Sequence, residues 1–571
     1  MKIRLLIVLL TFTFHLLPFH SIAQSWQWVN RIGSSGQYSG SDEDITGLQS
    51  DGFGNVYVTG RVMPYATFGS YQVPNSYNVD YQGFLARYDC DGNLKWVKTF
   101  GDNTSECFIS GLALDASGNP YIVGSLYNGI HFGDTIVNPG NNFFVAKYDS
   151  SGKLKWVNFA HTIANPQASF TPGAGIVINS AGTVITTGFN TIAGTTWPGI
   201  NLARGDFLVG FHPVSGNALW GTTMDTMPPS TYHLVPLDMK INTNDDIYMT
   251  GWFNDSVRLG PYLLASSEFG NHGFILKYNT NGFLIWAKQD YAISDLVAFL
   301  TMTVSGATMY IEGEALQGDT VLGYPVNSIG GDPQPSFILR MDTGANLQWG
   351  ITQDSASINY SYPLPAMTTD NSGNLYFISG WATFLKWGTS YPGLNLLPAN
   401  SSESYLLVLN PSGNVTSLTQ FPCWSNGAAS DGGEAIEITN SGDIYYAGAF
   451  SDKIWLPGFV GDTLYSSGGD NDLFVMKYGN ICTTTTVDNI KSTPEINVYP
   501  NPAMDKVTFK APKSDPNLQG EIYNVFGQLV QIFQLNTEVT IASTSGLARG
   551  VYLYRICREG SVLKTGKIVL Q

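Results

Sequence analysis

The sequence predicts an all-β protein: a seven-bladed β-propeller of four-stranded blades, closed by an N-terminal strand and followed by a small C-terminal β-sandwich. Short segments rich in Val, Ile, Tyr, Phe and Trp alternate with turns that carry Gly, Asn, Asp and Ser, as in β-hairpins. The same order of segments returns at a nearly constant period, which indicates a repeat fold. A glycine that ends the second strand marks seven units, with spacings of 64, 64, 63, 62, 67 and 68 residues: Gly60, Gly124, Gly188, Gly251, Gly313, Gly380 and Gly448.

Each unit is expected to hold four strands. In the second unit, a turn at Asp115 to Asn119 leads into an apolar strand that ends at Gly124, and an aromatic strand follows from Phe144 to Asp149. The fourth strand carries a tryptophan in five units: Trp96, Trp156, Trp220, Trp286 and Trp349. This strand is degenerate in the sixth unit and missing from the seventh.

The missing strand is predicted at the other end of the chain. Ser25 to Ile32 reads SWQWVNRI and resembles a fourth strand with no unit before it. A ring of sheets that takes its last strand from the opposite terminus leaves only short, protected edges. We therefore predict that Trp26 to Ile32 pairs with the seventh unit, and that the propeller covers residues 25–480.

Residues 1–23 are predicted to be an export signal peptide. Two basic residues precede an apolar core from Leu5 to Leu17, and small residues place the cleavage site between Ala23 and Gln24. A membrane anchor is the alternative reading, but the apolar run is too short to span a bilayer and polar residues interrupt it. We expect a mature chain that leaves the cytoplasm and has no transmembrane segment.

The charge of the mature chain argues against polyanionic partners. Removal of Lys2 and Arg4 with the signal peptide leaves 26 basic residues against 44 acidic ones, a net charge of −18. Such a surface repels nucleic acid and anionic membranes. No nucleic-acid partner is expected.

Cysteine and histidine patterns give no metal site and no cofactor. The five cysteines are too few and too scattered for a disulfide framework or a C-x-x-C site, so no bridge is predicted, although export would permit one. The histidines form no H-x-H or H-E-x-x-H motif. Calcium needs six to eight oxygen ligands, and a short turn such as DASGN supplies too few. Capping of the turn by its own Asp explains these residues better.

The repeats resemble the bacterial repeats described as SBBP-type β-propeller repeats. The matching pieces are G-N-V-Y-V-T-G at Gly54 to Gly60 and F-V-A-K-Y-D-S-S-G-K-L-K-W at Phe144 to Trp156. The resemblance covers roughly residues 25–480 and implies the architecture. It implies little about activity, because propellers include both binding proteins and enzymes.

The chain changes character after residue 480. Residues 481–495 are polar and Thr-rich, and they are predicted to be a linker. Residues 496–571 contain about seven short strand segments, which suits a small β-sandwich.

The motifs of residues 496–571 resemble the C-terminal sorting domain, type A, of cargo of the type IX (Por) secretion system of Bacteroidetes. They are V-Y-P-N-P from Val498, I-Y-N-V-F-G-Q from Ile522, L-A-R-G-V-Y from Leu547 and G-K-I-V-L-Q from Gly566. The positions that carry the motifs are Pro500, Asn501, Pro502, Gly527, Gly550, Tyr552 and Lys567. The resemblance implies the type IX secretion machinery as a partner and a protein that is secreted or attached to the outer-membrane surface. Whether the mature protein is anchored or released stays open.

The long loops between the second and third strands share one face of the predicted propeller, which is where a binding site is expected. Four tryptophans in or beside these loops are candidates for stacking on sugar rings: Trp197, Trp381, Trp387 and Trp455. Because Trp197 and Trp387 occupy a repeating position, packing in the core is the favoured interpretation for them. No catalytic residue is assigned, since no nucleophile elbow, P-loop or dinucleotide fingerprint occurs in a supporting context.

These observations predict an exported, non-enzymatic binding or structural module with an unidentified glycan or protein ligand. The alternative is a polysaccharide hydrolase or lyase on a propeller scaffold. That activity requires two carboxyl groups about 5 to 10 Å apart. No acidic pair stands out from the repeat background.

Overall fold

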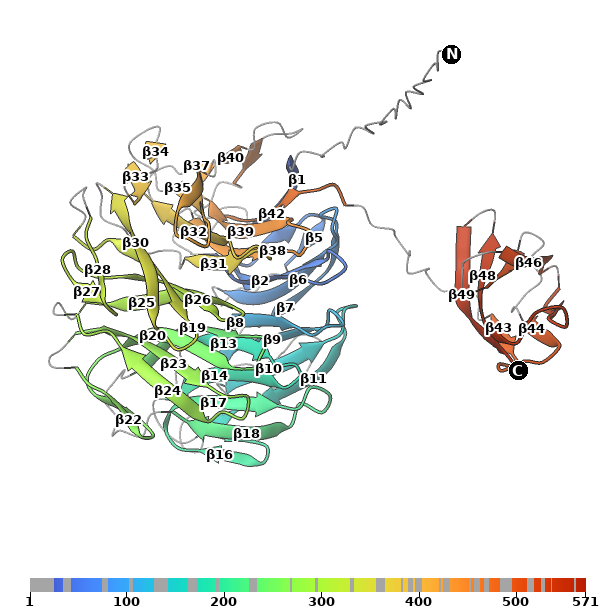
Figure 1. Cartoon of the computed structure of the whole chain (residues 1–571), viewed down its shortest axis with the longest axis horizontal. Helices are drawn as coiled ribbons and strands as arrows, with labels where there is room; N and C mark the ends of the chain where they lie inside the picture. The colour runs from blue at the N-terminus through green and yellow to red at the C-terminus, as the bar shows by residue number, and fades with distance from the viewer. Residues whose placement is uncertain are drawn as a thin grey trace, which may run out of the picture. The chain divides into compact units, whose positions relative to one another are not determined.

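The computed structural model of the chain is all-β and divides into two compact units, Met1–Cys482 and Thr483–Gln571 (Figure 1). The residues described are 25–33, 43–73, 81–101, 106–127, 142–162, 172–190, 195–224, 234–266, 270–292, 296–328, 333–355, 365–381, 384–388, 394–395, 403–420, 423–424, 432–450, 453–455, 463–466, 472–482, 496–510, 518–524, 529–535, 537–558 and 561–571. These residues form strands and turns, and none of them belongs to a helix. The predicted signal peptide with Ala23 and Gln24, most of the predicted linker, and Gly527 lie outside the described residues.

The described residues of the first unit contain seven antiparallel groups of four strands, named sheets 1 to 7; sheets 5 and 7 are parts of six-stranded sheets that also include two short strands each. Sheet 1 is β2 (Asp44–Ser50), β3 (Val56–Val62), β6 (Gln82–Tyr88) and β7 (Leu94–Phe100). Sheet 2 is β8 (Glu106–Leu114), β9 (Pro120–Tyr127), β10 (Asn142–Tyr148) and β11 (Leu154–Phe159). Sheet 3 is β13 (Pro172–Ile178), β14 (Val184–Asn190), β17 (Gly205–Phe211) and β18 (Ala218–Thr223). Sheet 4 is β19 (Leu234–Ile241), β20 (Ile247–Phe253), β23 (His272–Tyr278) and β24 (Leu284–Gln289).

The remaining groups follow the same order. Sheet 5 is β25 (Ala298–Ser305), β26 (Thr308–Glu314), β29 (Ser336–Asp342) and β30 (Leu347–Ser355). Sheet 6 is β31 (Ala366–Thr369), β32 (Leu375–Trp381), β35 (Glu403–Leu409) and β36 (Val415–Gln420). Sheet 7 is β38 (Gly432–Ile438), β39 (Ile444–Phe450), β42 (Asp472–Gly479) and β1 (Ser25–Gly33). Short strands accompany the sheets: β4 (Thr67–Phe68), β5 (Tyr71–Gln72), β12 (His161–Thr162), β15 (Thr195–Trp197), β16 (Ile200–Leu202), β21 (Val257–Leu259), β22 (Tyr262–Leu264), β27 (Thr320–Val321), β28 (Tyr324–Pro325), β33 (Phe384–Trp387), β34 (Leu394–Asn395), β37 (Cys423–Trp424), β40 (Lys453–Trp455) and β41 (Thr463–Tyr465).

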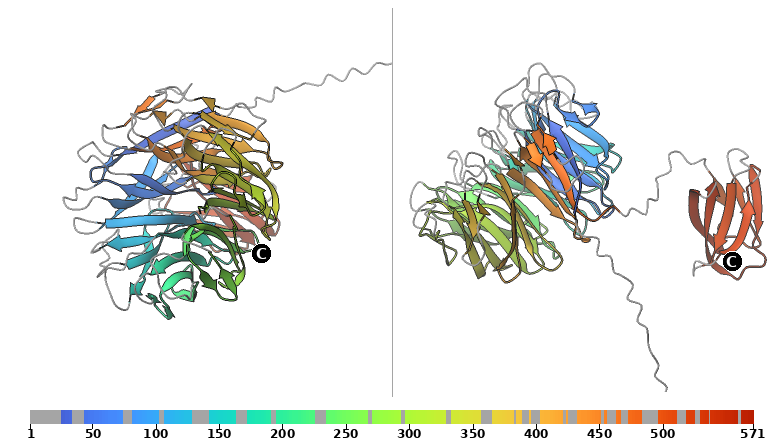
Figure 2. Two further views of the ribbon diagram at one scale, coloured as in Figure 1. Left: turned by 90° about the vertical axis from the view of Figure 1, so that its left-hand side faces the viewer. Right: turned by 90° about the horizontal axis from the view of Figure 1, so that it is seen from above.

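The first strands of neighbouring sheets contact one another in a closed series. β2 contacts β8, and the series continues through β13, β19, β25 and β31 to β38, which contacts β2 again. Figure 2 shows sheets of successive colour next to one another, with the orange strands of sheet 7 beside the blue strands of sheet 1. Because each sheet is covered on both faces, second strands such as β3 are buried almost throughout.

In the D-x-x-G-N turns, the Asp carboxylate accepts hydrogen bonds from backbone N–H groups of the turn and so stabilises it. In the turn of sheet 1, Asp51 Oδ1 accepts hydrogen bonds from the backbone N–H groups of Phe53 and Asn55, both at 2.9 Å. The glycine of this turn, Gly54, has φ of 80°, a conformation that side chains with a Cβ rarely adopt. The same Asx geometry recurs at Asp89, Asp115, Asp149, Asp342 and Asp370.

Tryptophans of several fourth strands join a sheet to the next one. The Trp96 indole donates to the backbone carbonyl of Ser150 at 3.0 Å, in the turn between the third and fourth strands of sheet 2. A Cβ atom added at Gly152 would lie only 2.8 Å from the indole ring of Trp96. Trp156 and Trp349 donate in the same way to Pro213 and Pro411, at 3.2 and 3.0 Å.

Sheet 7 is completed by β1, as predicted. β1 pairs antiparallel with β42 from Ser25↔Gly479 to Ile32↔Leu473, with a register shift between Trp26 and Trp28. We call this pairing the seam. Trp28 then repeats the tryptophan contact across the seam, since its indole donates to Cys90 of sheet 1 at 2.9 Å.

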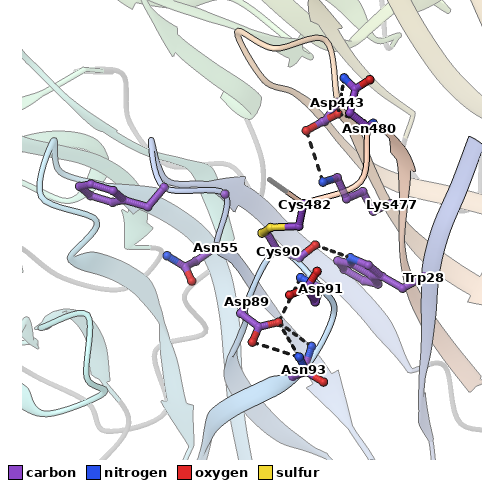
Figure 3. The surroundings of a disulfide bond; sticks show 12 residues. Trp28, Asn55, Asp89, Cys90, Asp91, Asn93, Asp443, Lys477, Asn480 and Cys482 are labelled. Atoms are coloured by element: carbon purple, nitrogen blue, oxygen red, sulfur yellow. Dashed lines mark hydrogen bonds and ion pairs between the residues drawn. A yellow bond between two sulfur atoms is a disulfide. The ribbon is translucent and has the colours of Figure 1, made fainter. Parts of the chain in front are cut away.

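The expectation of no disulfide was wrong. Cys90 is bonded to Cys482, with Cα atoms 5.8 Å apart and a sequence separation of 392 residues (Figure 3). Cys90 lies in the turn between β6 and β7, and Cys482 follows β42, so the bond ties the end of sheet 7 to sheet 1. Cys482 thus belongs with the first unit, although the sequence placed it in the linker. Cys107 and Cys557 are free and buried.

The second unit contains the seven strands expected from the sequence, in two sheets. One sheet has the order β43 (Asn497–Tyr499), β44 (Lys506–Lys510) and β47 (Val539–Ser543). The other has the order β46 (Leu529–Gln534), β45 (Leu518–Tyr523), β48 (Gly550–Arg558) and β49 (Ser561–Leu570). The core between them includes Ile496, Phe509, Ile522 and Ile568, each at most 1% exposed.

We expect truncation of Trp28 to destabilise the first unit strongly. Trp28 is 6% exposed and lies between the rings of Tyr88 and Tyr445. Trp28→Ala should lower the free energy of unfolding by about 3 to 5 kcal/mol, measured by denaturant unfolding of the mature chain. Phe53→Ala is the control, because Phe53 is 72% exposed and its truncation leaves no cavity. Equal stabilities of the two variants would contradict the closure.

Candidate functional site

The structure separates the four candidate tryptophans. Trp197 and Trp387 are buried, with exposed fractions of 2% and 0%. Trp197 packs edge-on against Phe211, with ring centroids 4.9 Å apart, and Trp387 against Phe377 at 5.6 Å. Neither indole offers a face for a sugar ring.

For the other two candidates, Trp381 and Trp455, the structure describes only the backbone. Trp381 ends β32 and Trp455 ends β40. Their side chains lie outside what the structure describes. Both residues close a strand at the start of a long loop, so they remain the candidates for a loop-face binding site.

The turn carboxylates serve the backbone. Hydrogen bonds from Asn346 and Gly344 hold the pKa of Asp342 below its usual value. Such a carboxylate already accepts two or more N–H groups, which leaves it poorly suited to a metal. In the described part of the chain, one group of possible metal ligands stands out, Cys90, Asp91 and Cys482, and its two sulfurs are joined in the disulfide.

Charged and polar residues lie on the first strands of sheets 4, 5 and 7. Lys240 Nζ lies 2.6 Å from Asp238 Oδ1 on β19. The other Asp238 oxygen accepts hydrogen bonds from the Thr301 hydroxyl at 3.0 Å and from the Met302 backbone at 2.9 Å, both on β25. Asp238 is therefore fixed between two neighbouring sheets. We call Asp238, Lys240, Thr301 and Glu437 the first-strand cluster.

Glu437 on β38 is the member with an altered acidity. Its carboxylate contacts the Ser50 hydroxyl of β2 at 3.4 Å. Burial raises the pKa of Glu437 to about 7, against the opposing effects of the Ser50 hydrogen bond and the Lys240 ammonium.

Sequence reasoning missed this cluster, although an internal alignment contains the signal. In each sheet, one first-strand residue pairs with the second-strand residue that is usually the repeated tyrosine. These residues are Gln49, Ala113, Val177, Lys240, Thr303, Thr368 and Glu437. Charge appears at this position only in sheets 4 and 7.

A second acidic group is buried away from that cluster. Glu312 on β26 is 1% exposed. Burial raises the pKa of Glu312 well above its usual range and nearby Glu314 raises it further, while a hydrogen bond from Ser336 acts in the opposite direction. The Glu312 carboxyl group therefore keeps its proton to a higher pH than an exposed glutamate does.

In the second unit, Asn501 joins the first motif of the sorting domain to the last. The Asn501 amide donates to the backbone carbonyl of Lys567 at 2.6 Å and accepts from the N–H of Val569 at 2.9 Å. Next to it, Ala503 donates to the Val569 carbonyl at 2.8 Å. The segment around Asn501 therefore covers the free edge of β49, which protects the C-terminal strand.

The other motif positions have structural roles where they are described. Tyr552 is 8% exposed, and its hydroxyl donates to the Ala548 carbonyl at 2.9 Å. Gly550 begins β48 with φ of 149°. Pro500 and Pro502 flank Asn501 and follow β43. Lys567 is exposed, as are Pro500, Asn501, Pro502 and Gly550.

Residues 497–571 match the family model of the secretion system C-terminal sorting domain. The chain thus carries a sorting domain of the type IX secretion system at its C-terminus, which indicates export to the cell surface or release. No curated protein matches the chain. In the described residues, no helix is long and apolar enough to cross a membrane.

Several solved structures resemble the chain weakly. One is PorZ, described as an essential surface component of the type IX secretion system of Porphyromonas gingivalis, with 12% identity, 92% of this chain and 75% of that chain covered, and a TM-score of 0.26. Another, of unknown function from Dyadobacter fermentans, has 9% identity, coverages of 67% and 97%, and a TM-score of 0.35. A third is an ulvan lyase, with 9% identity, coverages of 95% and 97%, and a TM-score of 0.26. At such scores these likenesses say nothing reliable about fold or function.

Glu312 should make stability depend on pH. The folded chain holds a proton on Glu312 that the unfolded chain releases near pH 4.5, so stability falls as pH rises above that value. Glu312→Gln should weaken this fall and raise the melting temperature at pH 8 more than at pH 5. Asp91→Asn, which removes an exposed carboxylate, is the control. The same pH slope for Glu312→Gln and the parent chain would contradict a raised pKa of Glu312.

Loss of the Asn501 amide should loosen the second unit. Asn501→Ala removes two hydrogen bonds to β49, worth about 1 to 3 kcal/mol together. Limited proteolysis of the full chain should then cut residues 496–571 faster, with cleavage of the first unit unchanged. Asn497→Ala, at an exposed position of β43, is the control. Equal cleavage rates for both variants would contradict the stabilising role of the two Asn501 hydrogen bonds to β49.

Proposed function

We propose that residues 25–482 form a seven-bladed β-propeller of SBBP-type repeats, delivered by the type IX secretion system. In this proposal the propeller is a non-enzymatic binding or structural module outside the cell. The match of residues 497–571 to the sorting-domain family carries the export part of the proposal. The closed series of first-strand contacts and the recurring tryptophan contacts support the architecture.

The ligand that suits this chain is a glycan without negative charge, or a protein. The mature chain has a net charge of −18, which disfavours polyanions. Many of its carboxylates are taken up in turns, as at Asp51 and Asp342. Trp381 ends β32 and Trp455 ends β40. Aromatic side chains of this kind can stack on the apolar faces of sugars.

Binding of the mature chain to an array of neutral and acidic glycans tests the proposal. We expect selective binding to neutral glycans, without cleavage. Trp381→Ala or Trp455→Ala should weaken binding at least tenfold if the residue stacks on a sugar, a loss of about 1.4 kcal/mol. Trp387→Phe is the control, since it alters a buried indole. Preference for acidic glycans would contradict the proposal, and binding to protein alone would reassign the ligand class.

A polysaccharide hydrolase or lyase is the second candidate, and Glu437 favours it. A carboxyl group with a pKa of about 7, within electrostatic reach of Lys240, could act as a general acid or base. If any glycan of the array is cleaved, Glu437→Gln should abolish cleavage and leave binding intact. Cleavage that survives Glu437→Gln would move the search for the catalytic pair away from the first-strand cluster.

A further inference from the structure

The end of β42 is the point at which the second unit is attached to the first. Gly479 ends β42, Cys482 follows three residues later, and the second unit starts at Thr483. Any force applied to the sorting domain therefore enters the first unit at Cys482. A pull on the chain during export by that domain, as proposed above, would act in this direction.

Without a covalent bond, β42 is poorly placed to resist such a force. It pairs antiparallel with β1 on one side and with β39 on the other. A pull from its C-terminal end would load these pairs one at a time, starting at Gly479↔Ser25. The register shift between Trp26 and Trp28 interrupts the β1 pairing close to this end. The weakest stretch of the seam is therefore loaded first.

Two polar contacts stabilise the C-terminal end of β42, but they do not change the direction in which a pull acts on this strand. The Asn480 backbone donates to Asp443 Oδ1 at 2.8 Å, and Lys477 Nζ lies 3.3 Å from Asp443 Oδ2. Lys477 and Asp443 are largely buried, with side chains 2% and 13% exposed. Figure 3 shows both contacts beside the disulfide. Both act on β42 itself and give way when the strand moves.

The disulfide transmits the force from Cys482 to Cys90 in sheet 1. Cys90 is 5% exposed in the turn between β6 and β7. Asp89 Oδ1 holds this turn by accepting from Asp91 and Asn93 at 3.1 and 2.8 Å. From β1, Trp28 donates to the Cys90 carbonyl at 2.9 Å, and Asn30 donates to Gly92 at 2.7 Å. A pull on Cys482 thus reaches two strands of sheet 1 together and bypasses β42.

We propose that the Cys90–Cys482 bond is a mechanical stop that keeps the seam closed while the chain is pulled by its sorting domain. This proposal rests on the proposed route of export. An exported chain meets an oxidising compartment, so the bond is in place before the pull begins. The bond is specific to this direction of force, because it joins the residue next to the sorting unit to a sheet other than its own.

Force spectroscopy on the purified mature chain tests the proposal. One handle is placed at the C-terminus and the other at position 283, where Phe283 is 70% exposed on sheet 4. In the oxidised chain we expect the first unit to yield in a high-force event. Cys482→Ser, Cys90→Ser and the parent chain in a dithiol reductant should all lose this event and show low-force peeling of β42. The same high-force event with and without the bond would overturn the proposal.

A second pulling geometry separates a mechanical stop from general stabilisation. Handles at positions 283 and 53, both exposed, load the first unit without pulling on β42. Here Cys482→Ser should unfold at the same force as the oxidised parent chain. An equal loss of force in both geometries would show a general stabiliser and overturn the proposal. Neither geometry uses secretion machinery or a ligand, so these results are independent of whether the proposed export and binding hold.

Discussion

Neighbouring sheets of the first unit depend on one repeated contact, in which the indole of a fourth-strand tryptophan lies on the turn of the next sheet. At Gly92, Gly152 and Gly216 the turn residue beneath the ring is a glycine with positive φ. A Cβ there would stand within about 3 Å of ring atoms and could not be accommodated. The indole N–H then finds a backbone carbonyl, which satisfies a polar group that burial would otherwise leave unpaired. Sheet and turn therefore constrain each other, one pair after another.

Tyrosines of the second strands supply a parallel set of links. Tyr57 donates to Gly118 at 2.7 Å, Tyr310 to Gly373 at 3.2 Å, and Tyr445 to Gly54 at 3.2 Å. The last of these runs from sheet 7 to sheet 1, so the seam uses the same chemistry as the junctions between consecutive sheets. A closure built from repeated parts needs no special sequence of its own. This explains how SWQWVNRI could be recognised as a fourth strand in isolation.

Local sequence therefore predicted the strands, the hydrogen bonds of the turns and the completion of sheet 7 by β1. Each of these depends on residues close together in the chain or on a repeated pattern. It did not predict the Cys90–Cys482 bond, because two cysteines 392 residues apart carry no spacing signal and meet only through closure. The first-strand cluster was missed for a related reason. Lys240 and Glu437 look like ordinary strand residues until the pairing shows that they share one position in different sheets. The burial of Trp197 and Trp387 was foreseeable, since a residue that recurs at one place in every repeat serves the repeat.

The seam also decides where the chain enters and leaves the first unit. Ser25 and Gly479 face each other across one strand pair, so the beginning and the end of this unit are neighbours in space. Because the sheets contact one another in a closed series, these contacts do not fix the position of the chain ends, which could lie at another turn. A permuted gene that joins residue 482 to residue 25 and opens the chain at another turn would encode the same set of sheets. What is attached at either end can change without any sheet being redesigned.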